Sequence, residues 1–128
     1  MHPISIKGVL LVEGNVVLVR NHRNEWELPG GRMDPGETLE QTLVREFEEE
    51  LSIRVEAQGI IDSYLFEVIP SEQVFIVTYG CRLLGKFVPV VSEEHTEFGL
   101  HEPADLGRIA VPAGYARSIH AWSAHVRP

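Results

Sequence analysis

The segment from Gly30 to Ile53, GGRMDPGETLEQTLVREFEEELSI, decides the fold of this 128-residue chain. It opens with a double glycine and the turn signal Asp34-Pro35-Gly36, after which Thr38 and Gln41 have the spacing of a helix capping box. Apolar residues then recur at helical intervals, at Leu39, Leu43, Val44, Phe47 and Leu51. The pattern predicts a helix over residues 38–51.

The same helix carries an acidic face. Glu46, Glu49 and Glu50 fall within an arc of roughly 100°, whereas Glu48 lies about 160° or more around the helix from Glu46 and Glu50. Like charges three or four residues apart destabilise a helix by about 0.2–0.5 kcal/mol per pair, unless a positive charge lies between them. A magnesium, manganese or calcium ion would supply that charge, since these ions prefer oxygen ligands. For the glutamates alone, a solvated acidic surface is the alternative.

This segment resembles the signature of the Nudix hydrolases, G-x5-E-x7-R-E-U-x-E-E-x-G-U, in which U is a bulky aliphatic residue. The matching positions are Gly31, Glu37, Arg45, Glu46, Glu49, Glu50 and Ile53. The sequence departs from the signature at Phe47, which replaces an aliphatic residue, and at Ser52, which replaces a glycine. A non-glycine residue in the left-handed conformation costs about 1–2 kcal/mol, so Ser52 predicts either a shifted helix end or modest strain.

The resemblance implies an enzyme that uses magnesium, or manganese in its place, to cleave a pyrophosphate joining a nucleoside to another group X. Metal ions neutralise the charge of such a substrate and lower the pKa of bound water. By resemblance, Glu49 and Glu50 are the principal metal ligands, and Glu46 is either a third ligand or the general base. The backbone carbonyl of Gly30 is a further ligand.

Glu37 and Arg45 resemble the buried pair that orients the loop and the helix in this family, with a surface ion pair as the alternative. Arg32 follows the double glycine, where it either meets a phosphate oxygen or is solvated. Three other basic residues could supply positive charge to a substrate, namely Lys7, Arg20 and Arg23.

Many members of the family recruit another acidic residue from a loop beyond this segment, and residues 92–97, SEEHTE, are the natural place for it. Glu94 is the first choice as a further metal ligand and Glu93 is the second, and a role for Glu97 stays open. An exposed charge cluster is the alternative. His95 and His101 could serve as proton carriers, but a lone histidine is more often exposed or hydrogen-bonded, so neither belongs to the expected catalytic set.

The rest of the chain predicts strands and a second helix. The expected elements are a hairpin of strands 4–12 and 16–20, strands 54–66 and 73–84, a shorter strand 86–91, a helical turn near 102–106 and a helix over 113–125. We find no repeat or linker that would divide residues 1–128. The order predicts one α/β domain with a mixed β-sheet, and the resemblance implies the α/β/α sandwich of the Nudix hydrolases.

The composition of the chain limits which kinds of partner it is expected to bind. The net charge of −8 disfavours binding of a nucleic acid polymer and leaves a small-molecule nucleotide as the expected substrate. No apolar run approaches the roughly 20 residues that span a bilayer, and the start lacks the pattern of a signal peptide. Cys81 alone cannot form an internal disulfide, so we expect a cytoplasmic protein. The resemblance also admits a homodimer, because dimers are common in this family.

Two other functions stay open. A silent nucleotide-binding or regulatory module usually lacks one or more of the signature carboxylates, which this chain keeps. Removal of a 5′ pyrophosphate from RNA is less attractive at this net charge. X could belong to a nucleotide sugar, an ADP-ribose-like compound, a dinucleotide or a nucleoside triphosphate. Pro70 lies near the position of a proline in the ADP-ribose-cleaving branch, but a proline between two strands is equally a turn residue.

Overall fold

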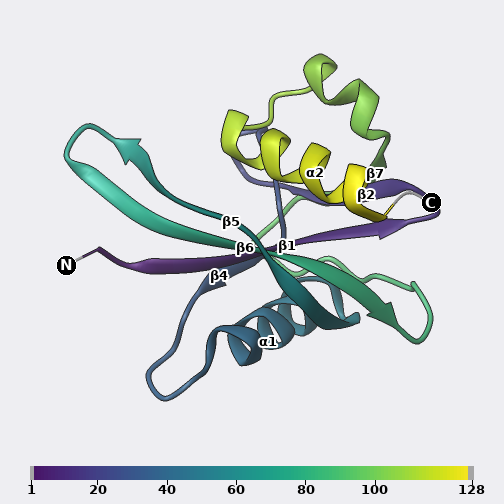
Figure 1. The fold of residues 1–128 in the computed structure, drawn as a ribbon, viewed down its shortest axis with the longest axis horizontal. Helices are drawn as coiled ribbons and strands as arrows, with labels where there is room; N and C mark the ends of the chain where they lie inside the picture. The colour runs from purple at the N-terminus through teal and green to yellow at the C-terminus, as the bar shows by residue number, and fades with distance from the viewer. Residues whose placement is uncertain (1, 127–128) are drawn as a thin grey trace.

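The computed structural model describes residues 2–126. The elements in chain order are β1 (Ile4–Val12), β2 (Asn15–Arg20), β3 (Trp26–Glu27), β4 (Gly30–Arg32), α1 (Leu39–Leu51), β5 (Arg54–Ile69), β6 (Glu72–Leu84), β7 (Glu97–His101), the 3₁₀ helix η1 (Pro103–Arg108) and α2 (Ala113–Val126) (Figure 1). Within the described part of the chain, no helix combines the length and the apolar character that a membrane span requires.

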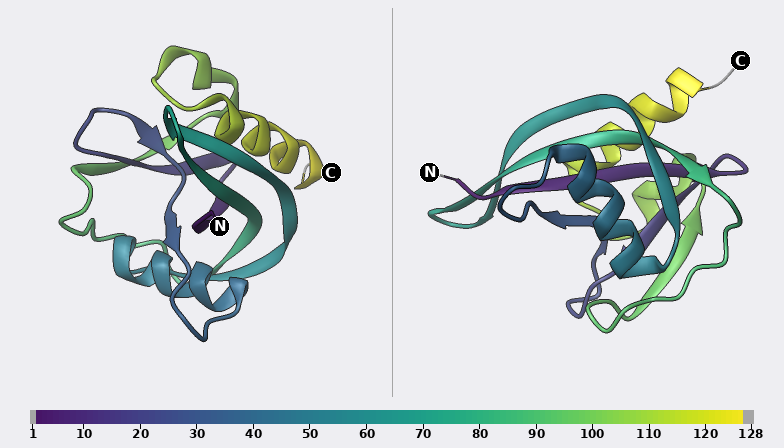
Figure 2. Two further views of the ribbon diagram at one scale, coloured as in Figure 1. Left: turned by 90° about the vertical axis from the view of Figure 1, so that its left-hand side faces the viewer. Right: turned by 90° about the horizontal axis from the view of Figure 1, so that it is seen from below.

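The strands form a mixed sheet with β1 at its centre. The main path runs β3-β2-β1-β6-β5, with β4 paired to β1 and β7 paired to β2. One edge of β1 runs parallel to β6. Its other edge pairs antiparallel with β4 near the start of the strand and with β2 at its end. The sheet therefore opens between β4 and β2, and Figure 2 shows how strongly its strands curve.

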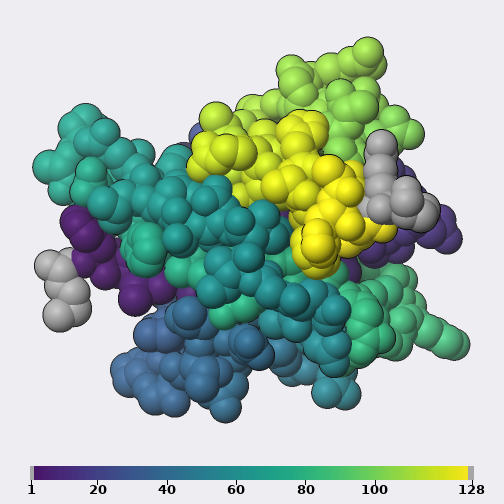
Figure 3. Space-filling view, in the orientation of Figure 1, coloured from purple at the N-terminus to yellow at the C-terminus, as the bar shows by residue number. Residues whose placement is uncertain are grey.

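The two helices cover opposite faces of the strands, with α1 below and α2 above in Figures 1 and 3. Side chains of β1 alternate between the two layers, as successive residues of a strand do. Ile6 and Leu10 pack against Phe47 of α1, whereas Val9 packs in the cluster that contains Ile119 of α2. The expected α/β/α sandwich with a mixed sheet is confirmed.

The predicted helix is confirmed, with Thr38 as the N-cap of α1. The Thr38 side chain accepts from the backbone of Gln41, and the Gln41 side chain accepts from the backbone of Thr38, which completes the capping box. Ser52 ends the helix in the left-handed conformation, with φ 56° and ψ 33°. The helix end is therefore not shifted, and Ser52 takes the conformation that favours glycine.

The hairpin and the two long strands are confirmed, but the expected strand 86–91 is wrong. This stretch runs past the end of α1, where Val90 N–H donates to the Leu51 carbonyl and Ser92 N–H donates to the Glu50 carbonyl. The last carbonyls of a helix lack partners within it, so the extended chain satisfies them instead of pairing with a strand.

Three short strands did not follow from the sequence. The double glycine lies within β4, where Gly30 and Gly31 pair with Lys7 and Ile6 of β1. The other two are β3 and β7, which both pair with β2.

Candidate active site

Arg45 organises the acidic face of α1. Its Nε donates to Glu37 Oε2 at 2.6 Å and its Nη2 donates to Glu37 Oε1 at 2.9 Å, which makes a bidentate ion pair. Its Nη1 donates to Glu46 at 2.9 Å and to Glu49 at 3.1 Å, and its Nη2 also donates to the backbone carbonyl of Arg32 at 3.0 Å. The Arg45 guanidinium lowers the pKa of Glu37 to about 2. Arg45 therefore joins the loop before α1 to the carboxylates on the helix.

The three helix carboxylates differ in exposure. Glu50 is 1% exposed and Glu46 is 9% exposed, whereas the Glu49 side chain is 58% exposed. Glu50 Oε2 accepts from Gly30 N–H at 3.0 Å, but Glu50 Oε1 is buried without a hydrogen-bond partner among the described residues. Burial raises the pKa of Glu50 to about 9, assisted by the nearby charge of Glu46 and opposed by that of Lys7.

The double glycine lets β4 approach its neighbours closely. Gly30 has φ +144°, and a Cβ atom there would lie 2.0 Å from the carbonyl oxygen of Ile6. A Cβ atom on Gly31 would lie 2.6 Å from the carboxylate of Glu46. A side chain at position 30 would therefore push β4 away from β1, and a side chain at position 31 would push it away from α1.

His95 and Glu27 complete this region, and the sequence did not indicate either role. His95 Nε2 lies 2.8 Å from Glu27 Oε1, and His95 Nδ1 lies 3.5 Å from Glu50 Oε1. The His95 side chain is only 6% exposed. Burial acts to raise the pKa of Glu27, but the hydrogen bond to His95 and the charge of Lys7 outweigh it and lower the pKa. The two residues are 68 positions apart, so no local spacing could have revealed the contact.

The acidic residues of the same loop lie elsewhere. Glu94 is exposed in a turn, and Glu97 pairs with Arg20 at 3.2 Å. The backbone carbonyl of Glu93 lies 3.1 Å from His22 Nε2. The structure therefore brings His95 of this loop, rather than one of these three glutamates, beside Glu50.

Lys7 is a buried cation next to the same carboxylates. It is 8% exposed, and its Nζ lies 5.8 Å from the ring centre of Tyr115. Burial opposes the charged form, but Tyr115 and the carboxylates of Glu27, Glu50 and Glu46 outweigh this effect and raise the pKa of Lys7. Lys7 therefore carries a buried positive charge near the carboxylates of the site.

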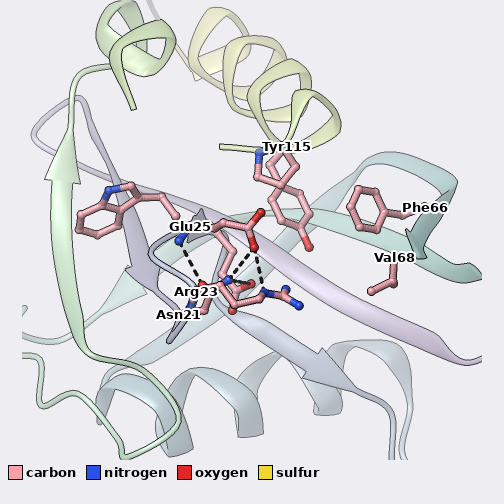
Figure 4. Close-up of a pocket in the computed structure, with 9 residues that line it drawn as sticks. Asn21, Arg23, Glu25, Phe66, Val68 and Tyr115 are labelled. Atoms are coloured by element: carbon pink, nitrogen blue, oxygen red, sulfur yellow. Dashed lines mark hydrogen bonds and ion pairs between the residues drawn. The ribbon is translucent and has the colours of Figure 1, made fainter. Parts of the chain in front are cut away.

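An aromatic cleft of ≈ 430 Å³ adjoins the site through Glu27 (Figure 4). Its walls carry the rings of Trp26, Phe66 and Tyr115, the polar side chains of Asn21, Arg23, Glu25 and Glu27, and the apolar residues Val68 and Pro112. The rings of Phe66 and Tyr115 are nearly parallel, with centres 6.5 Å apart. A cleft that combines aromatic rings with charged and polar side chains can bind a small molecule that has both an apolar and a polar part.

The three arginines expected to contact a substrate lie in three different places. Arg23 lines the aromatic cleft and pairs with Glu25 at 3.1 Å. Arg20 pairs with Glu97, and its guanidinium lies 5.7 Å from the ring centre of Trp26. Arg32 lies at the end of β4, on a different hollow. Of the three, only Arg23 lines the aromatic cleft.

The donor groups fit a hard divalent cation. The helix offers carboxylate oxygens, and one of them, Glu50 Oε1, is buried without a hydrogen-bond partner in the described part of the chain. Over residues 2–126, however, no three acidic, histidine or cysteine side chains already converge on one point. Glu46 and Glu49 instead contact Arg45. These contacts use Oε1 of Glu46 and Oε2 of Glu49, so a cation could bind the second oxygen of each carboxylate while Arg45 holds the first.

Comparison with known proteins gives the family. Nudix hydrolase 3 of Caenorhabditis elegans is 44% identical over 71 residues, which are 56% of this chain and 29% of that protein. The mitochondrial ADP-ribose pyrophosphatase of Rattus norvegicus is 47% identical over 49 residues, which are 38% of this chain and 13% of that protein. The aligned part is thus less than a third of either relative.

The fold has close counterparts as well. The crystal structure of the MutT protein from Methanosarcina mazei Go1 matches 99% of this chain and 96% of its own, with a TM-score of 0.84 at 23% identity. The family model of the NUDIX domain matches residues 1–122. The chain therefore belongs to the Nudix family.

Proposed function

We propose that this protein hydrolyses the pyrophosphate bond of nucleoside diphosphates linked to a group X, with a divalent metal ion as cofactor. The observation that carries the proposal is the environment of Glu50. This carboxylate is 1% exposed, one of its oxygens is held by Gly30 N–H, and the other, 3.5 Å from His95 Nδ1, has no hydrogen-bond partner among the described residues. Burying a polar atom without a partner is unfavourable, which indicates a positively charged ligand at this point.

Magnesium is the proposed ion, with manganese as a substitute, because the available ligands are oxygen atoms. Such an ion supplies charge neutralisation for the phosphates and lowers the pKa of bound water. Glu49 and Glu50 are the proposed principal ligands, with Glu46 as a third ligand or the general base and the Gly30 carbonyl as a further ligand. Glu94 remains a candidate only if its loop brings it inward.

The residues around the ligands are proposed to position them. Arg45 fixes Glu46 and Glu49 from one side, and Glu37 holds Arg45 in turn through two hydrogen bonds. His95 lies against Glu50 on the other side. Ligands held by such contacts keep their orientation when substrate binds.

The aromatic cleft is the proposed nucleoside site. A base between Phe66 and Tyr115 would gain stacking energy of about 1–3 kcal/mol. Asn21 and Glu25 offer polar groups to the edge of the base, and Arg23 offers a positive charge.

The identity of X is less constrained. The name of the rat relative makes ADP-ribose a reasonable member of a substrate panel. Pro70 adds no support for it, because it lies in the turn between β5 and β6. No observation favours a silent module or an RNA substrate over this proposal. A cytoplasmic location, a homodimer and a single domain over residues 1–128 stay predictions.

The test is a magnesium-dependent turnover screen over ADP-ribose, nucleotide sugars, dinucleoside polyphosphates and nucleoside triphosphates. We expect cleavage between phosphorus atoms in at least one class, no cleavage of a nucleoside monophosphate and no turnover once tightly bound metal is removed by a chelator. Comparable rates on AMP, or undiminished rates after removal of metal, would show that the proposal is wrong.

A further inference from the structure

A second hollow shares Val68 with the aromatic cleft. It has a volume of ≈ 470 Å³ and lies between the tip of the β5–β6 hairpin, the start of β1 and the end of β4. We call it the hairpin hollow, and the lining residues used below are Pro3, Arg32, Ser71, Glu72 and Gln73, besides Val68. In Figure 1 and in the right panel of Figure 2, the hairpin tip and the start of the chain project side by side.

Backbone hydrogen bonds fix the walls of the hairpin hollow. Phe75 N–H donates to the Pro3 carbonyl at 2.9 Å, which holds the start of the chain against β6. Met33 N–H donates to the Ile4 carbonyl at 3.2 Å, which holds the end of β4 against β1. The hollow therefore lies between segments that pair with each other.

The acidic site contacts a residue that lines each of the two hollows. Gly30 and Arg32 are two residues apart in β4, or about 6.6 Å at the rise of an extended strand. At Gly30, the backbone N–H donates to Glu50, which lies beside His95. His95 in turn contacts Glu27, which lines the aromatic cleft. Two residues further along β4, Arg32 lines the hairpin hollow, and its backbone carbonyl accepts a hydrogen bond from Arg45. A substrate that bridges the carboxylates can therefore reach one hollow with each of its ends.

We propose that the hairpin hollow binds the X group, and that X is a phosphorylated sugar with free hydroxyls. The inference rests on the proposed function and adds a second subsite to it. Arg32 offers a cation to the phosphate on the X side, and Ser71, Glu72 and Gln73 offer donors and acceptors that match sugar hydroxyls. The apolar surfaces of Val68 and Pro3 can cover the face of a sugar ring.

The charge of Glu72 argues against an alternative occupant. A nucleoside triphosphate would place only additional phosphate on this side of the site, where it would meet that carboxylate. Like charges oppose binding. The hollow therefore favours nucleotide sugars and ADP-ribose over nucleoside triphosphates.

The products would separate into the two hollows. A bond forms between the oxygen of water and one phosphorus atom, and the bond from that phosphorus to the bridging oxygen breaks. The hydrogens of the water molecule pass to the products or to solvent. A nucleoside monophosphate then lies in the aromatic cleft, and the phosphorylated sugar lies in the hairpin hollow.

Product binding tests this arrangement directly, using amide NMR spectra of the magnesium-saturated protein. Ribose 5-phosphate at millimolar concentration should shift the amides of residues 71–74 and of Arg32, whereas AMP should shift those of residues 21–27 and of Tyr115. Each ligand should still shift its own residues when the other is present in excess.

A matched pair of variants sharpens the test. Gln73→Trp fills the hairpin hollow and should weaken binding of ribose 5-phosphate at least tenfold, which is about 1.4 kcal/mol. Gln58→Trp places the same ring on an exposed position of β5 that lines neither hollow, and it should leave binding unchanged. Both variants should keep the dispersed spectrum of the folded protein.

The inference is wrong if ribose 5-phosphate shifts no residue of the hairpin hollow, if it competes with AMP, or if both variants bind it equally. Each of these results stands apart from the proposed function. That function would fail separately, through absence of metal-dependent pyrophosphate cleavage in the turnover screen.

Discussion

The acidic face of α1 and the aromatic cleft adjoin each other but are assembled differently. The acidic face comes from one continuous stretch, in which Arg45 contacts Glu37, Glu46 and Glu49 within thirteen residues of chain. The cleft takes its side chains from residues 21–27, from the β5–β6 hairpin and from the start of α2. Under the proposed function, metal binding would depend on spacing within one segment, whereas substrate choice would depend on segments that can vary independently.

The largest effect should come from removing charge on the acidic face. Glu49→Gln and Glu50→Gln should each lower magnesium-saturated turnover about 10³-fold or more, because an amide supplies neither the charge nor the affinity of a carboxylate ligand. Glu48→Gln is the matched control. Glu48 is half exposed and pairs with Arg54 at 3.4 Å, so its variant should stay within a few-fold of the parent. An equal loss of turnover in Glu48→Gln and Glu50→Gln would contradict the proposal that Glu50 is a metal ligand.

An intermediate effect is expected for the residue that positions the ligands. Arg45→Met removes the hydrogen bonds to Glu37, Glu46 and Glu49 and should lower turnover about 10–100-fold, in the range for loss of a contact that orients metal ligands. The concentration of magnesium needed for half-maximal rate should change as well. Arg54→Met, which breaks only the exposed pair with Glu48, should change neither quantity. A similar loss in both variants would argue that Arg45 has no special role.

The cleft should respond in a different kinetic parameter. Tyr115→Leu removes the partner of Phe66 and should raise KM about two- to tenfold with little change in kcat, because aromatic pairing contributes about 0.5–1.5 kcal/mol to binding. Phe87→Leu disrupts the edge-to-face pair of Phe87 and Phe98, whose ring centres lie 6.0 Å apart in the core on the α1 side of the sheet, and it should leave KM unchanged. A fall in kcat alone for Tyr115→Leu would contradict the separation of the two regions.

The smallest effect concerns stability in acid. Arg45 lowers the pKa of Glu37 from its ordinary value of 4.5 to about 2 in the folded protein. The ionised pair therefore stabilises the fold above pH 4.5, and this contribution is lost as the pH falls from 4.5 toward 2. Urea unfolding of the metal-free protein should show Glu37→Gln to be less stable than the parent above pH 4.5, with the difference shrinking below it. A difference in stability between Glu37→Gln and the parent that grows below pH 4.5 would contradict the lowered pKa of Glu37.

The sequence predicted what depends on neighbouring residues. The capping box at Thr38 and the helical spacing that follows involve contacts within a few positions, and α1 has the expected limits. Ser52 in the left-handed conformation was one of two expected outcomes. The long strands and the layered arrangement also follow from local patterns of apolar residues.

What the sequence missed depends on distant contacts. The stretch 86–91 has the composition of a strand, but its backbone instead satisfies the last carbonyls of α1. His95 and Glu27 meet only because β2, β3 and β7 bring their loops together. The two hollows likewise combine segments from several elements, and no spacing within one segment indicates them.

Paramagnetic relaxation by manganese tests the central claim, that the acidic face of α1 holds the metal and the aromatic cleft does not. Amide signals of Gly30, Gly31 and residues 46–50 should broaden first as manganese is added to the protein, before those of residues 66–68 and Tyr115. Glu50→Gln should shift this broadening to higher manganese concentrations, while Glu48→Gln should not. Broadening that begins in the aromatic cleft, or that is the same in both variants, would contradict the account.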